Sequence, residues 1–344
     1  MDENLQMKGG SRRFDVFMYK LSIDAMSGDL GSCIVVEACE SFIQSHQDAY
    51  LYVAGKKEEL QNLEKYDRIE IVDARDIVPM DAGIMSVRRK KDSSMVKAVT
   101  LANDGIVDGV VSCGSTGAFY TSAMLFLKRI EGIEKSCLMA ILPTYNQKGV
   151  AMLDVGANAD NTSEQLKSFA IMGNVYAKNI RGISQPKVAL LNIGTESKKG
   201  DLVHQETYKM LENEETLHFV GNIEGRDILL GDVDVIVTDG FSGNIALKTC
   251  EGTASLVMKM IKEELMSSLM GKIGALFAKK SLYGLKDKFD YKSVGGALMM
   301  GFEKAVVKAH GASDAVAFAN AMDLAYQMVK LDVVGQMKEG LKNK

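Results

Sequence analysis

Short apolar runs alternate with amphipathic stretches along most of this 344-residue chain. The apolar runs predict strands over residues 17–26, 49–55, 68–74, 109–114, 137–144, 150–157, 187–194, 218–224 and 233–240. Helical patterns lie between several of them, as at 163–180 after the capping sequence Asn161-Thr162-Ser163-Glu164. Nearly continuous apolar strands that alternate with helices predict an α/β fold whose mostly parallel sheet is covered on both faces. From about residue 245 onward the pattern is helical.

Small and polar residues gather where six of the predicted strands end. The clusters read IDAMSGD, SCGSTG, LDVGAN, LNIGTE, GNIEG and TDGFSGN. Ligands of open parallel sheets bind at the carboxyl ends of the strands. The clusters therefore predict a polar site that several loops form together.

Three segments have the chemistry of an anion site. Gly114, Ser115 and Thr116 precede a helical pattern, and N–H groups and the helix dipole favour negative charge at a helix start. A second helix start follows Ser93 and Ser94, and the loop 193–200 adds Lys199. The dinucleotide-binding G-x-G-x-x-G and the P-loop motif do not occur in the sequence.

Composition narrows the function classes. With 47% hydrophobic and 25% charged residues the chain can bury a large core, and its net charge of −4 argues against a general nucleic-acid binder. No apolar run reaches the roughly 18 residues of a transmembrane helix. The four histidines are not clustered, so we expect no zinc site. Five scattered cysteines indicate reduced thiols, and Cys113 is better explained as a small buried residue than as a thioester-forming nucleophile.

The motifs, taken in order, resemble the bacterial phosphate acyltransferase family (PlsX). The resemblance runs from about residue 19 to 330 and includes RRKKDSSM, VSCGSTGA, LNIGTESKKG, VTDGFSGNIALK and KAHGASDAVAFANA. It implies an enzyme that converts acyl-acyl-carrier protein and inorganic phosphate to acyl phosphate and free carrier protein, for phospholipid synthesis. It also implies a three-layer α/β/α fold like that of isocitrate and isopropylmalate dehydrogenases, and a homodimer. Ser115 and Cys113 stand where the family often has Asn and Ala.

The expected reaction needs no strong acid or base, because phosphate is already a nucleophile and a thiolate is a good leaving group. The protein must instead orient phosphate and stabilise an oxyanion, and this implies neither a metal nor an organic cofactor. The predicted catalytic residues are Lys199 and His310. The predicted phosphate- and substrate-binding residues are Ser93, Ser94, Gly114, Ser115, Thr116, Asp154, Asn158, Asn222, Asp239 and Asn244.

Two further surfaces are predicted. Arg88, Arg89, Lys90 and Lys91 are expected to dock the acidic carrier protein. Residues 256–288 form an apolar, lysine-rich pattern that predicts a protruding helical hairpin over about 253–292, with its tip at Gly271 and Gly274. Leu269, Ile273 and Phe277 on one face are expected to contact the inner leaflet of the cell membrane, although packing in a dimer interface or in the core explains the same pattern.

The expected organisation is a single domain over 18–335, preceded by a disordered extension or cloning remnant at 1–17 and followed by a tail at 336–344. The resemblance implies a cytoplasmic, peripherally membrane-associated protein that works with a membrane glycerol-3-phosphate acyltransferase. Three alternatives stay open: a phosphotransacetylase-like enzyme that uses acyl-coenzyme A, a nicotinamide-dependent decarboxylating dehydrogenase, and a non-catalytic lipid- or carrier-protein-binding scaffold.

Overall fold

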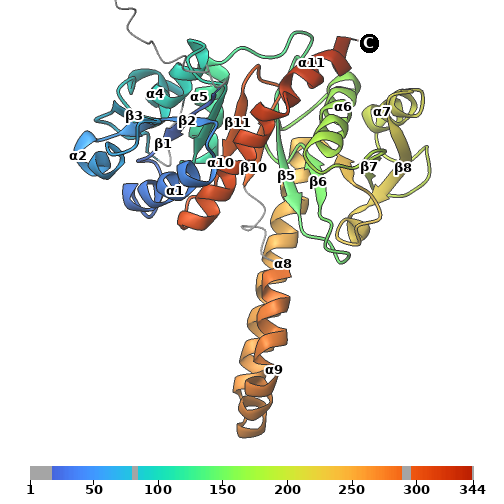
Figure 1. Cartoon of the computed structure of the whole chain (residues 1–344). Coiled ribbons are helices and arrows are strands. Elements are labelled where there is room, and N and C mark those ends of the chain that lie inside the picture. The colour runs from blue at the N-terminus through green and yellow to red at the C-terminus, as the bar shows by residue number, and fades with distance from the viewer. Residues whose placement is uncertain (1–17, 80–83, 289–295, 343–344) are drawn as a thin grey trace, which may run out of the picture.

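A computed structural model describes residues 18–79, 84–288 and 296–342 as a three-layer α/β/α sandwich with a helical hairpin that projects from it (Figure 1). The strands are β1 (Tyr19–Asp24), β2 (Ala49–Gly55), β3 (Ile69–Asp73), β4 (Gly109–Ser112), β5 (Cys137–Leu142), β6 (Val150–Leu153), β7 (Lys187–Asn192), β8 (His218–Glu224), β9 (Val235–Val237), β10 (Ala297–Met300) and β11 (Ala305–Lys308). The helices are α1 (Ser32–Ser45), α2 (Lys57–Leu60), α3 (Ile84–Arg89), α4 (Ser94–Asn103), α5 (Thr116–Phe126), α6 (Ser163–Asn179), α7 (Leu202–Glu212), α8 (Gly240–Met266), α9 (Leu269–Lys288), α10 (Ala315–Lys330) and α11 (Val333–Lys342).

The strands of the sheet do not all run in one direction. Their order is β3-β2-β1-β4-β11-β10-β5-β6-β9-β7-β8, and every neighbouring pair is parallel except β11–β10, β10–β5 and β5–β6. Three reversals in a row leave β6, β9, β7 and β8 running opposite to β1, β2, β3, β4 and β11. The polar strand ends therefore do not all meet at one edge, as they would in a wholly parallel sheet. The ends of β1 and β4 lie at one edge, and those of β6, β7, β8 and β9 lie at the other.

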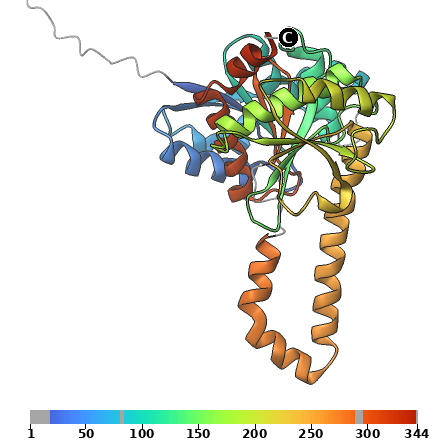
Figure 2. The same cartoon turned by 90° about the vertical axis from the view of Figure 1, so that its right-hand side faces the viewer.

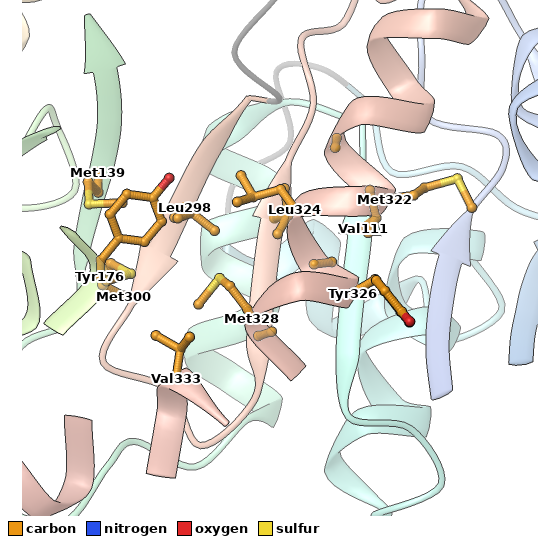
Figure 3. Packing of buried hydrophobic residues seen from close by; sticks show 14 of the residues in the cluster. Val111, Met139, Tyr176, Leu298, Met300, Met322, Leu324, Tyr326, Met328 and Val333 are labelled. Carbon is orange, nitrogen blue, oxygen red and sulfur yellow. The ribbon is translucent and has the colours of Figure 1, made fainter. Parts of the chain in front are cut away.

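Two apolar cores hold the layers together, one on each face of the sheet. On one face α1, α10, α11 and α6 cover the strands, and Figure 3 shows Met139, Leu298 and Met300 of the central strands near Tyr176 of α6. On the other face α4 and α5 pack on the first half of the sheet, and the start of α8 packs near its centre. The alternation along β11 points Val307 into the first core and Val306 into the second. Lys308 therefore faces the side that α5 and α8 flank.

All nine strands predicted from the sequence are present, but β10 and β11 were missed. Both fall in the segment that was predicted to be helical, and both lie at the centre of the sheet. Each is only four residues long, so neither gives a pattern that separates strand from helix. They are stabilised by pairing with β4 and β5, which are distant in sequence.

The predicted hairpin is formed by α8 and α9, which project far beyond the sheet (Figures 1 and 2). The chain turns at Ser267 and Ser268, and Gly271 and Gly274 lie within α9 instead of at the turn. Gly271 permits close packing there, because a Cβ on it would lie 2.5 Å from the carbonyl oxygen of Leu265. The predicted end of the hairpin at 292 and the extension at 1–17 lie outside the described residues.

The predicted tail from residue 336 is ordered as far as the structure describes it. Residues 333–342 form α11, and Met337 and Leu341 are buried in the core beside α6. The boundary placed at 335 therefore falls inside a helix.

Candidate active site

A pocket of about 350 Å³ lies where the sheet reverses direction, between α5 and the start of α8. It takes residues from both sets of strand ends. Thr116 of α5 and Lys308, His310 and Ser313 come from the first half of the sheet, and Gly156 and Asn244 come from the second. Its flank on β5 and β10 is apolar, with Leu138, Ala140, Ile141 and Ala297. The pocket thus has a polar end and an apolar side.

Lys308 is the last residue of β11 and is only 7% exposed. Its ammonium donates a hydrogen bond to the carbonyl oxygen of Ala309 and lines the pocket. Burial lowers the pKa of Lys308 to about 8, although the nearby Cys113, Asp29 and Asp24 oppose the shift. A buried lysine is costly to keep charged, so its position at the polar end marks it as a candidate anion-binding group. The sequence analysis missed it.

Cys113 lies near this ammonium but is fully buried. Burial and the charge of Asp24 raise the pKa of its thiol to about 12. A thiol with such a pKa stays protonated at neutral pH and is a poor nucleophile. The structure therefore favours the packing role that the sequence suggested for this residue.

Asp24, at the end of β1, organises the loops behind the pocket. Its two carboxylate oxygens accept hydrogen bonds from the hydroxyls of Ser94 and Ser112, each at 2.6 Å. Ser112 in turn accepts a bond from the backbone N–H of Gly114 at 3.0 Å. Ser93 caps α4 and donates to the carbonyl oxygen of Lys90 at 2.7 Å. Ser93 and Ser94 are fully buried, and the structure shows their hydroxyls in these internal bonds.

The start of α5 faces the pocket. Ser115 caps the helix by accepting from the N–H of Ala118 at 3.4 Å, and Thr116 and Gly117 line the pocket. The first N–H groups of a helix have no partner within it, so they are available to an anion. Gly114 must be a glycine, because a Cβ there would lie 2.3 Å from Met95 Cε and 2.8 Å from Ser27 Cβ.

His310 is exposed and lines the pocket two residues after Lys308. Its Nδ1 accepts a hydrogen bond from the backbone N–H of Ala312 at 3.2 Å. A neutral imidazole with this partner carries its proton on Nε2. The imidazole of His310 therefore lies at the polar end of the pocket.

Asp154, at the end of β6, has a positioning role. Its buried carboxylate accepts from the backbone N–H groups of Leu138, Gly156, Ala157 and Asn158 at 2.9–3.1 Å, and from the Asn158 side chain at 2.7 Å. Burial raises the pKa of Asp154, while these bonds act in the opposite direction. Asn158 also donates to the carbonyl oxygen of Ser136 at 2.8 Å. Both side chains thus fix the loop that carries Gly156 to the pocket wall.

Lys199, Asn222 and Asp239 do not line the pocket. The ammonium of Lys199 lies 3.8 Å from a carboxylate oxygen of Glu196, and Asn222 donates to the Glu196 carbonyl oxygen at 2.8 Å. Asp239 caps α8 by accepting from the N–H of Ser242 at 2.8 Å. The structure therefore brings together His310, Thr116 and Asn244 of the predicted set and separates Lys199 from them.

The surface residues predicted from sequence have clear positions. Arg88, Arg89 and Lys91 are exposed around the end of α3, whereas Lys90 pairs with Asp76 at 2.6 Å. On the hairpin, Leu269, Ile273 and Phe277 are 75%, 45% and 85% exposed. Among residues 18–79, 84–288 and 296–342, none of the helices has the length and hydrophobicity that crossing a bilayer requires. In the same part of the chain, no three His, Cys, Asp or Glu side chains are grouped as a metal site would need.

Comparisons with known proteins agree with the sequence motifs. A family model described as "Fatty acid synthesis protein" matches residues 19–336. The phosphate acyltransferase of Exiguobacterium sp. (strain ATCC BAA-1283 / AT1b) is 45% identical over 323 residues, which are 93% of this chain and 98% of the relative. That of Streptococcus equi subsp. zooepidemicus (strain H70) is 42% identical over 325 residues, or 94% and 97%. The chain belongs to the phosphate acyltransferase family.

Solved structures show the same fold in more distant proteins. A phosphotransacetylase from Streptococcus pyogenes has a TM-score of 0.61 at 17% identity, covering 91% of this chain and 94% of that one. A phosphotransacetylase from Staphylococcus aureus has a TM-score of 0.59 with the same identity and coverage. At such identity the likeness concerns the fold alone. The predicted α/β/α class with a mostly parallel sheet is confirmed.

The burial of Lys308 predicts a stabilising substitution. Its pKa is about 8 when folded, against an ordinary value of 10.5, so the buried charge costs stability below pH 8 and the cost disappears as pH rises to 10.5. We expect Lys308→Met to raise the free energy of unfolding at pH 7 by about 1–3 kcal/mol, with a smaller gain at pH 10. Denaturant unfolding at the two pH values measures this. The exposed Lys178→Met is the control, and equal effects of the two variants would contradict the prediction.

Proposed function

We propose that this protein transfers the acyl group of acyl-acyl-carrier protein to inorganic phosphate, giving acyl phosphate and free carrier protein for phospholipid synthesis. Membership of the phosphate acyltransferase family supports this assignment. The structural observation that carries it is the pocket with the buried Lys308 and the start of α5 at one end and an apolar side on β5 and β10. An anionic nucleophile and an acyl thioester need these two environments side by side.

The proposed reaction is a direct displacement. Phosphate is held by the Lys308 ammonium and the first N–H groups of α5, which include those of Thr116 and Gly117. A phosphate oxygen attacks the thioester carbonyl carbon, the new C–O bond forms, and the C–S bond breaks as the carrier's thiolate leaves. The Nε2–H of His310 donates to the carbonyl oxygen while it carries negative charge. The leaving thiolate takes up a proton from the phosphate or from water.

Lys199 was predicted to bind phosphate, but it does not line the pocket that contains Lys308. The loop 193–200 was predicted to supply the phosphate-binding cation, whereas the buried position of Lys308 favours Lys308 for that task.

A phosphotransacetylase-like use of acyl-coenzyme A is the second candidate function, because the fold is shared with phosphotransacetylases. Assays with both thiol carriers separate the two functions.

Substitution of the two lysines tests the phosphate site. Removal of a charged donor typically costs about 1.5–3 kcal/mol. We therefore expect Lys308→Ala to lower kcat/KM for phosphate by about 10- to 100-fold. Lys199→Ala should have a smaller effect, because its ammonium lies outside the pocket. The measurement is phosphate-dependent thiol release from acyl-carrier protein, with Lys198→Ala as the control. A larger loss for Lys199→Ala would place the phosphate at the loop 193–200 instead.

We further propose that the carrier protein docks on the exposed cations around the end of α3. Charge complementarity mainly raises association rates and is screened by salt. Reversal of Arg88 and Arg89 to Glu should raise KM for the carrier protein much more than KM for phosphate. Reversal of the exposed Lys178 and Lys209 to Glu is the matched control for net charge. An effect on phosphate alone would assign these arginines to the phosphate site.

The hairpin is proposed to bind the inner leaflet of the cell membrane, where a membrane glycerol-3-phosphate acyltransferase uses the product. Its end exposes Met270, Leu276 and Phe277 at 76%, 71% and 85%, beside the exposed Lys272 and Lys279. Apolar side chains with lysines suit an anionic bilayer surface. A homodimer through the same face is the competing explanation.

Polar replacement at the hairpin distinguishes these two explanations. Burial of one large apolar side chain contributes about 1.5–3 kcal/mol. Replacement of Leu269, Ile273 and Phe277 by Ser should therefore abolish sedimentation with phosphatidylglycerol vesicles while turnover in solution persists. Ser at the exposed Leu202, Val220 and Leu230 is the matched control. A monomeric hairpin variant that still sediments with vesicles would identify the face as a dimer interface.

A further inference from the structure

One row of side chains on α8 faces β5 beyond the pocket. Leu247, Cys250 and Ala254 recur at the three- and four-residue spacing of one helix face, and all three are partly buried. Their neighbours Thr249 and Thr253 are exposed. Leu247 and Cys250 also pack against the core on this side of the sheet. The base of the hairpin thus has an inner face before it leaves the sheet.

This row closes a second, smaller hollow of about 30 Å³. Its other walls are Leu142 and Pro143 at the end of β5, and Leu229. The hollow shares Leu247 and Glu251 with the main pocket, so the two are neighbours along α8. The wall residues of these two adjacent cavities, from the polar end at Lys308 past the apolar side on β5 to the base of the hairpin, are called the path below.

The chemistry of the path favours a hydrocarbon chain. At the hollow its walls are alkyl groups, a proline and a thiol, and the single carboxylate there, Glu251, already accepts a hydrogen bond from Lys248 at 2.7 Å. An arm that carries amide groups, such as the pantetheine of the carrier, would leave those amides without partners here, which is costly. Methylene groups have no hydrogen bonds to lose here, and each methylene that leaves water raises the binding constant about fourfold.

We propose that the acyl chain of the substrate lies between β5 and α8 and ends in the hollow formed by Leu142, Pro143, Leu229, Leu247, Cys250 and Ala254. The hollow then sets the chain length that the enzyme prefers. Short chains stop in the main pocket, and long chains reach Ala254. This inference rests on the proposed acyl transfer, because it assigns the position of the acyl group in that same site.

Filling the hollow tests the proposal. Ala254→Phe places a ring where the end of a long chain would lie, and Thr253→Phe places the same ring on the exposed neighbouring position. Phosphate-dependent thiol release is measured with butyryl-, octanoyl- and palmitoyl-carrier protein. We expect the ratio of kcat/KM for palmitoyl over butyryl substrate to fall at least tenfold, or about 1.4 kcal/mol, in Ala254→Phe and to stay at the wild-type value in Thr253→Phe.

Three results would overturn either the proposed position of the acyl chain or the proposed acyl transfer on which it rests. An unchanged ratio in a folded Ala254→Phe protein would show that the chain lies elsewhere. An equal loss for all three chain lengths would assign the path to the carrier's arm. Absence of phosphate-dependent release by the wild-type protein with every substrate would reject the proposed function itself.

A footprint on the wild-type protein provides a measurement that needs no variant and no turnover. Iodoacetamide labelling of Cys250, followed by mass spectrometry of its peptide, should slow severalfold in the presence of palmitate. Labelling of the exposed Cys33 is the internal control. Labelling of Cys250 that palmitate leaves unchanged would contradict the proposal.

Discussion

The reversal of strand direction at β10 and β5 determines where the candidate active site lies in this molecule. When all strands of a sheet are parallel, their carboxyl ends lie at one edge, and ligands of such sheets usually bind there. Here two oppositely directed sets meet across short antiparallel strands, and the pocket lies over that junction. The polar end comes from the loops after β4 and β11, and the opposite wall comes from the loop after β6 and the start of α8. Neither half of the sheet provides the site alone.

Two buried carboxylates hold these halves in comparable ways. Asp24 ends β1 and accepts hydroxyl donors from Ser94 at the start of α4 and from Ser112 at the end of β4. Asp154 ends β6 and accepts mainly backbone N–H groups of its own loop. Each carboxylate thereby ties together segments that lie near the pocket, since an unpaired buried carboxylate would be costly. The carboxylates of Asp24 and Asp154 have the chemistry of substrate ligands, but their hydrogen bonds hold the segments around the site in place.

The sequence predicted most of the local secondary structure, but it did not predict the features that depend on tertiary contacts. Long apolar runs gave nine strands, and the caps placed the starts of α4, α5 and α6 correctly. The short strands β10 and β11 exist because β4 and β5 pair with them, which no local pattern reveals. Missing β11 also hid Lys308, because a lysine is taken as exposed unless its strand is known to be central. Ser93 and Ser94 were predicted to bind phosphate, and the structure shows their hydroxyls in internal hydrogen bonds. A hydroxyl at a helix start can bind an anion or another group of the protein, and the sequence pattern is the same in both cases.

The helix α8 connects two regions that differ completely in environment. Its first turns form a wall of the pocket, and its far end stands in solvent about 40 Å away, as its 27 residues dictate. In a rigid helix of this length, a small rotation of the first turns at the pocket wall displaces the far end. Any restraint on the distal end also limits the angles that the wall can adopt. By thermodynamic reciprocity, a ligand that fixes the wall restrains the distal end by the same free energy. Binding of a ligand at the pocket wall and any restraint on the far end of the hairpin would therefore be thermodynamically linked.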